Sequence, residues 1–355
     1  MSGDPSPRLS EADAPGVADA LRRHGWLADS EAVASVAPAG EGNMNLTLRL
    51  RIAGGEGGSR SVILKQSRGH VEKYPSIPAP AERIVAEHGF YAEVAALDSA
   101  DRASVSSFLP TVRGFAEAER LLLLEDLGEA SDLTIVYAGE GFRGGELEAL
   151  GGWLGRLHAA TRGRAEPGLR DNGAMRELNA EHLFEVPLDG VARFGMDLDD
   201  LAAGLTAAAD RLRRDAGVRS AFHRGKAIYL APTGGDAVLL HGDFYPGSWL
   251  RTVAGVRVID PEFCFHGVPE VDAGIAVGHL ALAGRSVAEA EAFLGAYGHP
   301  LNAETLRDLA GVEVVRRLIG VAQLPLGGST PRVEMLGRAQ ATLAASADWR
   351  GLFAR

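Results

Sequence analysis

The sequence is poor in cysteine. Its 355 residues include one cysteine, Cys264. A single thiol cannot form an intrachain disulfide or supply a thiolate cluster for a metal ion, which excludes disulfide-stapled folds and zinc–thiolate folds. The lack of a disulfide framework favours a reducing, cytoplasmic setting.

Positive charge and long apolar segments are also scarce. Lys and Arg number 36 against 47 Asp and Glu, a net charge of -11, which argues against nucleic acid or an anionic membrane surface as the main partner. No stretch approaches the roughly 18 uncharged apolar residues of a membrane span, and no basic segment followed by an apolar core opens the chain. We therefore expect a soluble, unexported protein in which any basic site is local.

What the sequence does contain indicates two lobes, because 355 residues are many for one core. LTLRLRI alternates apolar and polar residues, and SVILK follows after the turn-forming AGGEGGSR, so residues 44–66 predict a β-hairpin. A helix is expected over 81–97, with Pro80 just ahead of it. Strands near 112–115 and 121–124 would complete a small sheet-rich lobe.

The remaining sequence is mostly helical in its periodicity, with short strands near 237–240 and 256–260. The boundary between lobes is expected within LEDLGEASD, residues 124–132. The predicted organisation is an α+β fold with an N-lobe over 1–126 and a larger helical C-lobe over 127–355.

Acidic residues follow both of these short strands. Asp243 comes after the first, Ser248 lies five positions later, and Asp260 and Glu262 follow the second. Strands this close in sequence usually pair, so we expect these oxygen-bearing side chains to converge on a Mg²⁺ site with room for phosphate oxygens. The alternative is that the acids cap turns and the serine only begins a strand.

The N-lobe carries candidate phosphate-binding residues. Gly40 and Gly42 lie at a turn between strands, where missing side chains let backbone N–H groups approach phosphate oxygens; a tight hairpin would explain them equally. Lys65 ends the next strand and could reach nucleotide phosphates, or be an ordinary surface lysine. Of the acids in the following helix, Glu87 is best placed to pair with Lys65.

This combination resembles the aminoglycoside phosphotransferase and choline kinase superfamily over most of the chain. The details look most like 5-methylthioribose kinases: GEGNMNL, LKQ, LEDL, Ser248 in place of the usual Asn, DPEF and RRLIGVAQ. The resemblance implies a two-lobed protein-kinase-like fold, with ATP and Mg²⁺ as cofactors.

The resemblance also implies individual roles. Asp243 would be the catalytic base or the acid that orients the acceptor hydroxyl, and Asp260 and Glu262 would bind Mg²⁺, with Ser248 contributing a hydroxyl or holding a water. The implied nucleotide contacts are Gly40, Gly42, Asn43, Lys65 with its partner Glu87, and the backbone of Glu125, Asp126 and Leu127.

Arg316 and Arg317 match a pair that in such kinases lies near the substrate and the transferring phosphate. Adjacent helical residues point about 100° apart, so we expect at most one of them to face the site and the other to serve an ion pair. His241 and Asp272 are interpreted as supports of the catalytic loop, and His158 as a packed or loop-supporting histidine.

The acceptor is the least specified part. The chain is shorter than typical methylthioribose kinases, and Tyr245 stands where the resemblance leads us to expect histidine. Two arginines near the site would repel polycations, so a neutral, sugar-like alcohol is favoured. The hypothesis is an ATP-dependent small-molecule kinase, monomeric or homodimeric, acting on methylthioribose or a related sugar; the alternatives are an aminoglycoside or amino-alcohol kinase and a nucleotide-binding pseudokinase.

Overall fold

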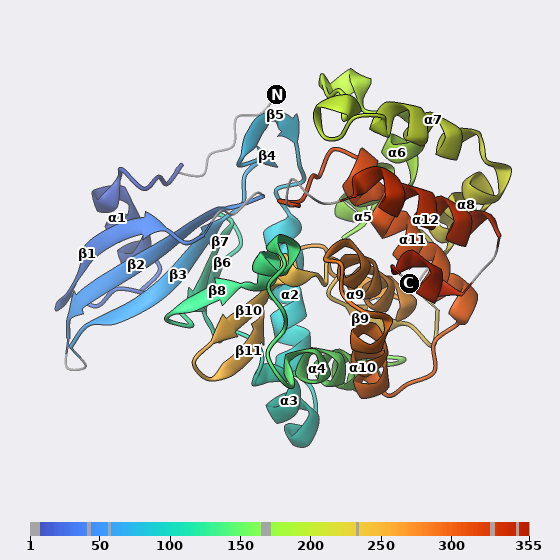
Figure 1. The fold of residues 1–355 in the computed structure, drawn as a ribbon. Coiled ribbons are helices and arrows are strands. Elements are labelled where there is room, and N and C mark those ends of the chain that lie inside the picture. Colours follow the sequence, from blue (N-terminus) through green and yellow to red (C-terminus); the bar gives the residue numbers. More distant parts are fainter. Residues whose placement is uncertain are drawn as a thin grey trace.

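The computed structural model describes residues 8–40, 44–55, 58–164, 172–231, 234–326, 331–345 and 348–354. A β-rich N-terminal region lies at the left of Figure 1 and a helical C-terminal region at the right, with α2 (Arg83–Ala95) between them. The predicted α+β, two-lobed fold is confirmed.

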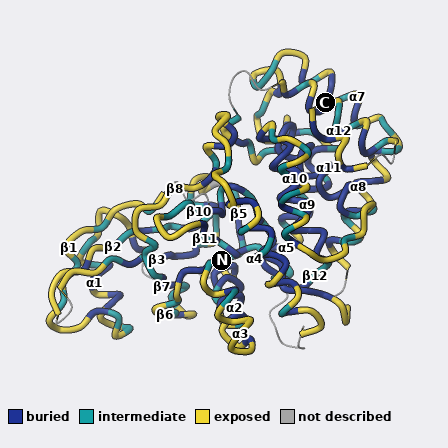
Figure 2. The backbone as a smooth tube through the Cα atoms, turned by 60° about the horizontal axis from the view of Figure 1, so that its bottom comes forward, coloured by how far each residue is buried: buried dark blue, intermediate teal, exposed yellow. Residues whose placement is uncertain are grey.

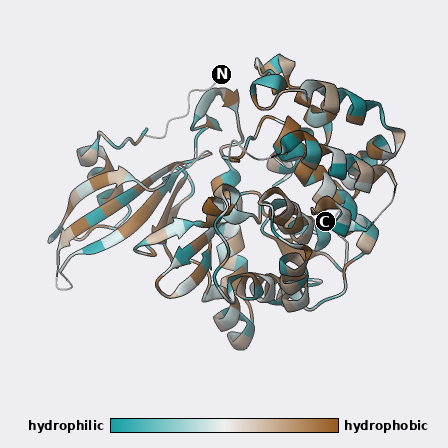
Figure 3. Cartoon of the chain, viewed as in Figure 1, coloured by the Kyte–Doolittle hydropathy of each residue, from teal (hydrophilic) through white to brown (hydrophobic). Residues whose placement is uncertain are grey.

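The N-terminal sheet is antiparallel, with strand order β1-β2-β3-β7-β6. Its strands are β1 (Glu31–Pro38), β2 (Leu46–Gly54), β3 (Arg60–Gln66), β6 (Val112–Ala116) and β7 (Leu121–Glu125). The predicted hairpin is therefore present as β2 and β3. Apolar and polar bands alternate along β2 in Figure 3, and Leu48, Leu50 and Ile52 are buried in a small core with α1 (Ala14–Arg23). This alternation is what lets one face of the sheet pack while the other stays polar.

α2 and α3 (Ser99–Ser106) follow a short hairpin of β4 (His70–Val71) and β5 (Tyr74–Pro78). The buried side chains of α2, among them Ile84, Phe90 and Val94, belong to the large hydrophobic cluster of the helical region rather than to the small core under the sheet. Leu122 and Leu124 of β7 belong to the same cluster, so α2 packs against the N-terminal sheet as well as against the helical region. The lobe boundary at residue 126 stays a prediction, although β7 ends one residue before it.

The C-terminal region is built mainly from helices. They are α4 (Glu146–Thr161), α5 (Gly173–Ala180), α6 (Val186–Asp189), α7 (Leu205–Arg214), α8 (Ala216–Tyr229), α9 (Glu270–Leu282), α10 (Val287–Tyr297), α11 (Ala303–Ile319) and α12 (Arg332–Ala344). A π-helical turn, η2 (Glu181–Glu185), joins α5 to α6, and the 3₁₀ turns are η1 (Leu133–Ala138), η3 (Ala192–Phe194), η4 (Leu198–Asp200), η5 (Pro246–Ser248) and η6 (Trp349–Leu352). Within the described part of the chain, no helix has the length and apolar character needed to cross a membrane.

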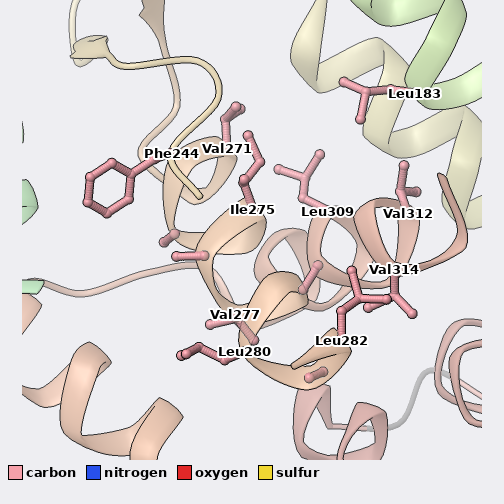
Figure 4. Close-up of a cluster of buried hydrophobic side chains, with 14 of the residues drawn as sticks. Leu183, Phe244, Val271, Ile275, Val277, Leu280, Leu282, Leu309, Val312 and Val314 are labelled. Carbon is pink, nitrogen blue, oxygen red and sulfur yellow. The ribbon is translucent and has the colours of Figure 1, made fainter. Parts of the chain in front are cut away.

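α9 and α11 form the centre of this region. They are dark along nearly their whole length in Figure 2, and every residue of α9 is buried. Figure 4 shows Ile275 and Val271 of α9 beside Leu309 of α11, with Phe244 of the loop before η5 at the edge of the same cluster. This packing fixes α11 relative to the loop that carries Asp243.

The predicted pairing of the strands near 237–240 and 256–260 is wrong. β9 (Val238–Leu240) pairs with β12 (Phe265–Gly267), whereas β11 (Gly255–Val258) pairs with β10 (Trp249–Thr252), which in turn pairs with β8 (Ala130–Asp132). The two residues after Thr252 allow β10 to fold back directly onto β11, and this local hairpin takes precedence over the longer connection. The loops that follow β9 and β11 nevertheless meet, because the Ile259 N–H donates to the Ser248 carbonyl at 3.0 Å.

Candidate active site

Lys65 lies between carboxylates from two different elements. Its Nζ donates to Glu87 Oε1 at 2.7 Å and also pairs with Asp260 Oδ1. The Lys65 side chain is 5% exposed and that of Glu87 is fully buried. Burial acts to lower the pKa of Lys65, but the charges of Asp260 and Glu87 outweigh it and hold that pKa above its ordinary value. The structure thus contains the predicted Lys65–Glu87 pair and links it to the loop after β11.

The loop from His241 to Ser248 is anchored from α9. Asp272, buried in the first turn of α9, accepts the His241 N–H at 2.7 Å and the Gly242 N–H at 2.9 Å, and His158 Nε2 lies 3.2 Å from its carboxylate. The His241 ring contacts the Ile259 carbonyl through Nε2 at 2.9 Å, and burial lowers the pKa of His241. These contacts are the loop-supporting ones that the sequence interpretation assigned to the three residues.

Gly242 is required where this loop meets the next one. Its φ is +85°, and a Cβ added there would lie 2.1 Å from the Phe263 carbonyl oxygen. Only glycine combines that backbone conformation with so close an approach. The residue brings the Asp243 loop and the Asp260 loop together.

Asp243 receives both arginines of α11. Arg317 Nη2 is 3.3 Å and Arg316 Nη2 3.6 Å from the same oxygen, Asp243 Oδ1. The prediction that only one arginine faces the site is therefore wrong. The two long side chains leave the helix in different directions, but Glu313, one turn earlier, is contacted by both Nε atoms, Arg317 at 2.7 Å and Arg316 at 3.1 Å, and their guanidinium groups converge beyond it.

Ser248 and Glu262 make contacts other than the predicted metal contacts. The Ser248 hydroxyl donates to the Asp243 carbonyl at 2.6 Å and is buried, so it closes the turn of its own loop. Glu262 accepts from Asn45 Nδ2 at 2.9 Å and lies 3.4 Å from Arg83 Nε. Burial raises the pKa of Glu262 to about 8.

Asp260 fits a metal ion better. Its side chain is 43% exposed, and Mg²⁺ is usually bound by one or two carboxylates together with substrate phosphates and water rather than by an all-protein cage. The described residues contain no group of three or more His, Cys, Asp or Glu placed to hold a metal ion. The metal roles of Asp260, Glu262 and Ser248 remain predictions.

The predicted nucleotide loop is partly described. Gly40 has φ +78°, and among the described residues no atom lies within 4 Å of the place that a Cβ would take, whereas Gly42 and Asn43 lie outside the described residues. Gly40 therefore has the conformation that the phosphate-loop interpretation requires, although a tight turn requires it too.

At the junction between the sheet and the helical region, the acidic side chains of Glu125 and Asp126 bind other residues of the N-terminal region. Glu125 accepts from the N–H and the hydroxyl of Thr111 at 3.0 and 2.7 Å, and Asp126 is 2.9 Å from Arg49 Nε and accepts from Ser61 at 2.6 Å. The nucleotide contacts expected from the main chain of Glu125, Asp126 and Leu127 stay a prediction.

Two functional candidates were missed from the sequence. Glu313 could have been found, because it lies three and four positions before the arginines, the spacing at which helical side chains meet. Arg83 is fully buried and donates to the carbonyls of Met44 and Pro80 and to Asn45 Oδ1, at 2.6, 2.7 and 2.9 Å. Its partners are distant in sequence or are main-chain atoms, so no local sequence pattern indicates that Arg83 is buried and bonded in this way.

Comparison with known proteins places this geometry in a family. The model of the phosphotransferase enzyme family, APH, matches residues 35–312. The chain belongs to this family. Lys65, Asp243 and Asp260 lie within the matched range, whereas Glu313, Arg316 and Arg317 lie just beyond it.

Curated relatives include two bacterial methylthioribose kinases. The protein from Exiguobacterium sibiricum is 30% identical over 248 residues, covering 68% of this chain and 59% of the relative. That from Pectobacterium atrosepticum is 24% identical over 278 residues, covering 74% and 63%. The chain thus spans about three fifths of the length of the curated relatives that it matches.

A solved structure supports the fold. The gentamicin–APH(2")-IIa complex aligns with a TM-score of 0.50 at 12% identity, covering 98% of this chain and all of the other. At this identity the likeness concerns the fold of the APH family and not the substrate.

Proposed function

We propose that this APH-family chain is an ATP-dependent kinase that phosphorylates a hydroxyl of a small, sugar-like molecule. One observation carries the proposal: two hydrogen-bonded loops present Asp243 with its pair of arginines and Asp260 with Lys65. Phosphoryl transfer requires little covalent chemistry from a protein, and depends on positioning and on stabilising charge at the phosphates.

On this proposal the N-terminal region binds the nucleotide. Lys65, oriented by Glu87, would contact the phosphates, the loop at Gly40 would cover them, and the main chain of 125–127 would meet the base. Asp260 would hold Mg²⁺, which when bound neutralises charge on the phosphates. Ser248 and Glu262 would have to exchange the hydrogen bonds described above to reach the same ion.

Asp243 would act on the acceptor. Because both guanidinium groups meet Oδ1, they fix the orientation of the carboxylate, and Oδ2 would be directed to the acceptor hydroxyl. A carboxylate in that position orients the hydroxyl and accepts its proton as the phosphoryl group is transferred. Arg316 and Arg317 would also offset charge on the transferring phosphoryl group.

A methylthioribose-type sugar is the leading acceptor. The names of the curated relatives support it, and so does the cationic pair beside Asp243, since a polycationic acceptor would meet like charge there. An aminoglycoside or amino-alcohol kinase is the second candidate. A pseudokinase is disfavoured because Lys65, Asp243 and Asp260 are all present.

The test is ADP release from Mg-ATP over a panel of methylthioribose, other pentoses, aminoglycosides, choline and homoserine. We expect acceptor-dependent ADP release with methylthioribose or another neutral pentose. Release only with cationic acceptors would favour the second candidate, and ATP binding without release on any acceptor would favour the pseudokinase.

A further inference from the structure

Glu313 is a buried carboxylate to which the resemblance assigned no role. It lies on α11, is 1% exposed, and is surrounded by three basic side chains: Arg317 Nε at 2.7 Å, Arg316 Nε at 3.1 Å and His279 Nε2 at 2.9 Å. Arg316 and Arg317 outweigh the effect of burial and hold the pKa of Glu313 well below its ordinary value.

The packing leaves space for this carboxylate. Gly278 of α9 faces it, and a Cβ at that position would lie 3.1 Å from the Glu313 Cβ. The next residue, His279, is fixed from its other ring nitrogen, where Nδ1 lies 2.5 Å from the Tyr137 hydroxyl. The imidazole cannot turn away from Glu313 without losing that contact.

Arg317 contacts the Asp243 loop at a second residue, Tyr245. The Arg317 guanidinium lies over the Tyr245 ring at 4.9 Å, and another neighbour of that ring is His279, also at 4.9 Å between centroids. Arg317 is therefore held by a carboxylate at Nε, by an aromatic face and by Asp243 at Nη2.

We propose that Glu313 is a positioning residue of the phosphoryl-transfer site. It turns two arginines, which adjacent helical positions would direct about 100° apart, onto one oxygen of Asp243. The inference rests on the proposed function, because Asp243 is the group that the arginines orient. Among the described residues, the ion pairs of Glu313 are with Arg316, Arg317 and His279 and not with Asp243, so it acts through the arginines.

α11 offers a matched control at Asp308. This carboxylate is also 1% exposed and also pairs with two arginines, Arg307 Nε at 2.9 Å and Arg224 Nε at 2.8 Å. Within the described part of the chain, neither of these arginines forms an ion pair with the Asp243 loop. Asp308→Asn therefore removes a buried charge from the same helix without touching the arginines of the site.

The experiment compares Glu313→Gln with Asp308→Asn and the wild-type chain. We expect Glu313→Gln to lower acceptor-dependent kcat by about ten- to a hundredfold, because a small displacement of a group in the site has an effect of this size. The Kd for ATP, measured by direct binding, should stay within about threefold. Asp308→Asn should melt earlier yet keep kcat per folded molecule. If Glu313→Gln loses only melting temperature, as Asp308→Asn does, Glu313 is merely structural and the proposal is overturned.

Two further measurements keep the test decisive. Should Glu313→Gln not fold, Glu313→Asp is the second variant, because it keeps the charge on a side chain that is one methylene shorter. We expect a smaller fall in kcat with ATP binding retained. An unchanged kcat would overturn the proposal. If the wild-type chain itself phosphorylates no acceptor, the proposed function fails, and a crystal structure of the Glu313 variant still tests the positioning. We expect at least one guanidinium to leave Asp243 Oδ1, and two unmoved arginines would refute the inference.

Discussion

At the scale of single residues, Asp260 combines charge, exposure and an unusual backbone. Its φ is +63°, a conformation that costs an L-residue about 1 kcal/mol or more but that Asp and Asn tolerate best. Its partly exposed carboxylate pairs with buried Lys65. Backbone conformations of this kind gather at functional sites, which agrees with the metal role proposed for Asp260.

Asp260→Asn tests this role with little change to the backbone. Asparagine tolerates the same φ, so the variant should fold, while the loss of charge should lower Mg-ATP turnover by at least about a hundredfold. Glu262→Gln is the comparison, and we expect it to change the Mg²⁺ concentration for half-maximal rate much less. The measurement is initial rate against Mg²⁺ concentration; full activity of Asp260→Asn, or wild-type activity in EDTA, would move the metal site elsewhere.

His279 predicts a pH dependence of stability. Burial lowers its pKa from an ordinary value of 6.5 to about 4. Between these values the unfolded chain binds a proton at this residue that the folded chain does not, so the free energy of unfolding falls as the pH falls, by up to about 1.4 kcal/mol per pH unit. Above pH 6.5 this loss of stability is absent, because His279 is neutral in both the folded and the unfolded chain.

The His279→Gln variant isolates that contribution from other titrating groups. Denaturant unfolding of both proteins at pH 7, 6 and 5 should show a shallower loss of stability for the variant over this window. Parallel pH profiles for the two proteins would mean that the pKa of His279 is the same in the folded and unfolded chains, in conflict with its burial between Tyr137 and Glu313.

At the scale of elements, the site depends on two loops that touch rather than on paired strands. The sequence interpretation placed Asp243 and Asp260 together for the wrong reason, since β9 and β11 are not neighbours. Hydrogen-bonding partners of short strands cannot be read from proximity along the chain when a tight turn offers a closer partner. The contact between the loops comes instead from Gly242 against Phe263 and from Ile259 against Ser248.

Gly242→Ala should therefore be far more disruptive than an ordinary glycine substitution. Gly298, at the C-cap of α10, has a similar φ of +76° but its nearest neighbour to a new Cβ is 3.6 Å away. We expect Gly298→Ala to cost about 1 kcal/mol of unfolding free energy and Gly242→Ala several times as much, because the second adds a clash with the Phe263 backbone. Denaturant unfolding measures both, and equal losses would show that the loops can separate without cost.

At the scale of the whole molecule, the fold class could be predicted and the division of the core could not. Alternation in β2 and β3 and the long helical periodicity farther on are local patterns, and they indicated the two regions correctly. That α2 packs into the large cluster beside the C-terminal helices depends on tertiary contacts of Ile84 and Phe90, for which periodicity indicates a buried face but not its partner.

The candidate site divides in the same way. Lys65 and Glu87 could be paired from strand and helix geometry, whereas Asp243 and Asp260 were placed together only through a strand pairing that the structure does not contain. The convergence of Arg316 and Arg317 on Asp243 could not be predicted, because it depends on Glu313, which lies between the two arginines and α9. The contacts of Glu262 with Asn45 and Arg83 join positions far apart in sequence, and no local pattern in a single sequence reveals such contacts.

The central claim is that Asp243 serves phosphoryl transfer from ATP to an acceptor hydroxyl, and one measurement tests it most directly. Purified wild-type chain and Asp243→Asn are incubated with Mg-ATP and the acceptor found in the panel, the phosphorylated product is followed by phosphorus NMR, and ATP binding is measured separately. We predict one phosphate monoester formed per ADP by the wild-type chain, a rate about two to four orders of magnitude lower for Asp243→Asn, and ATP affinity within a few fold. Near-normal product formation by a folded Asp243→Asn would contradict the account.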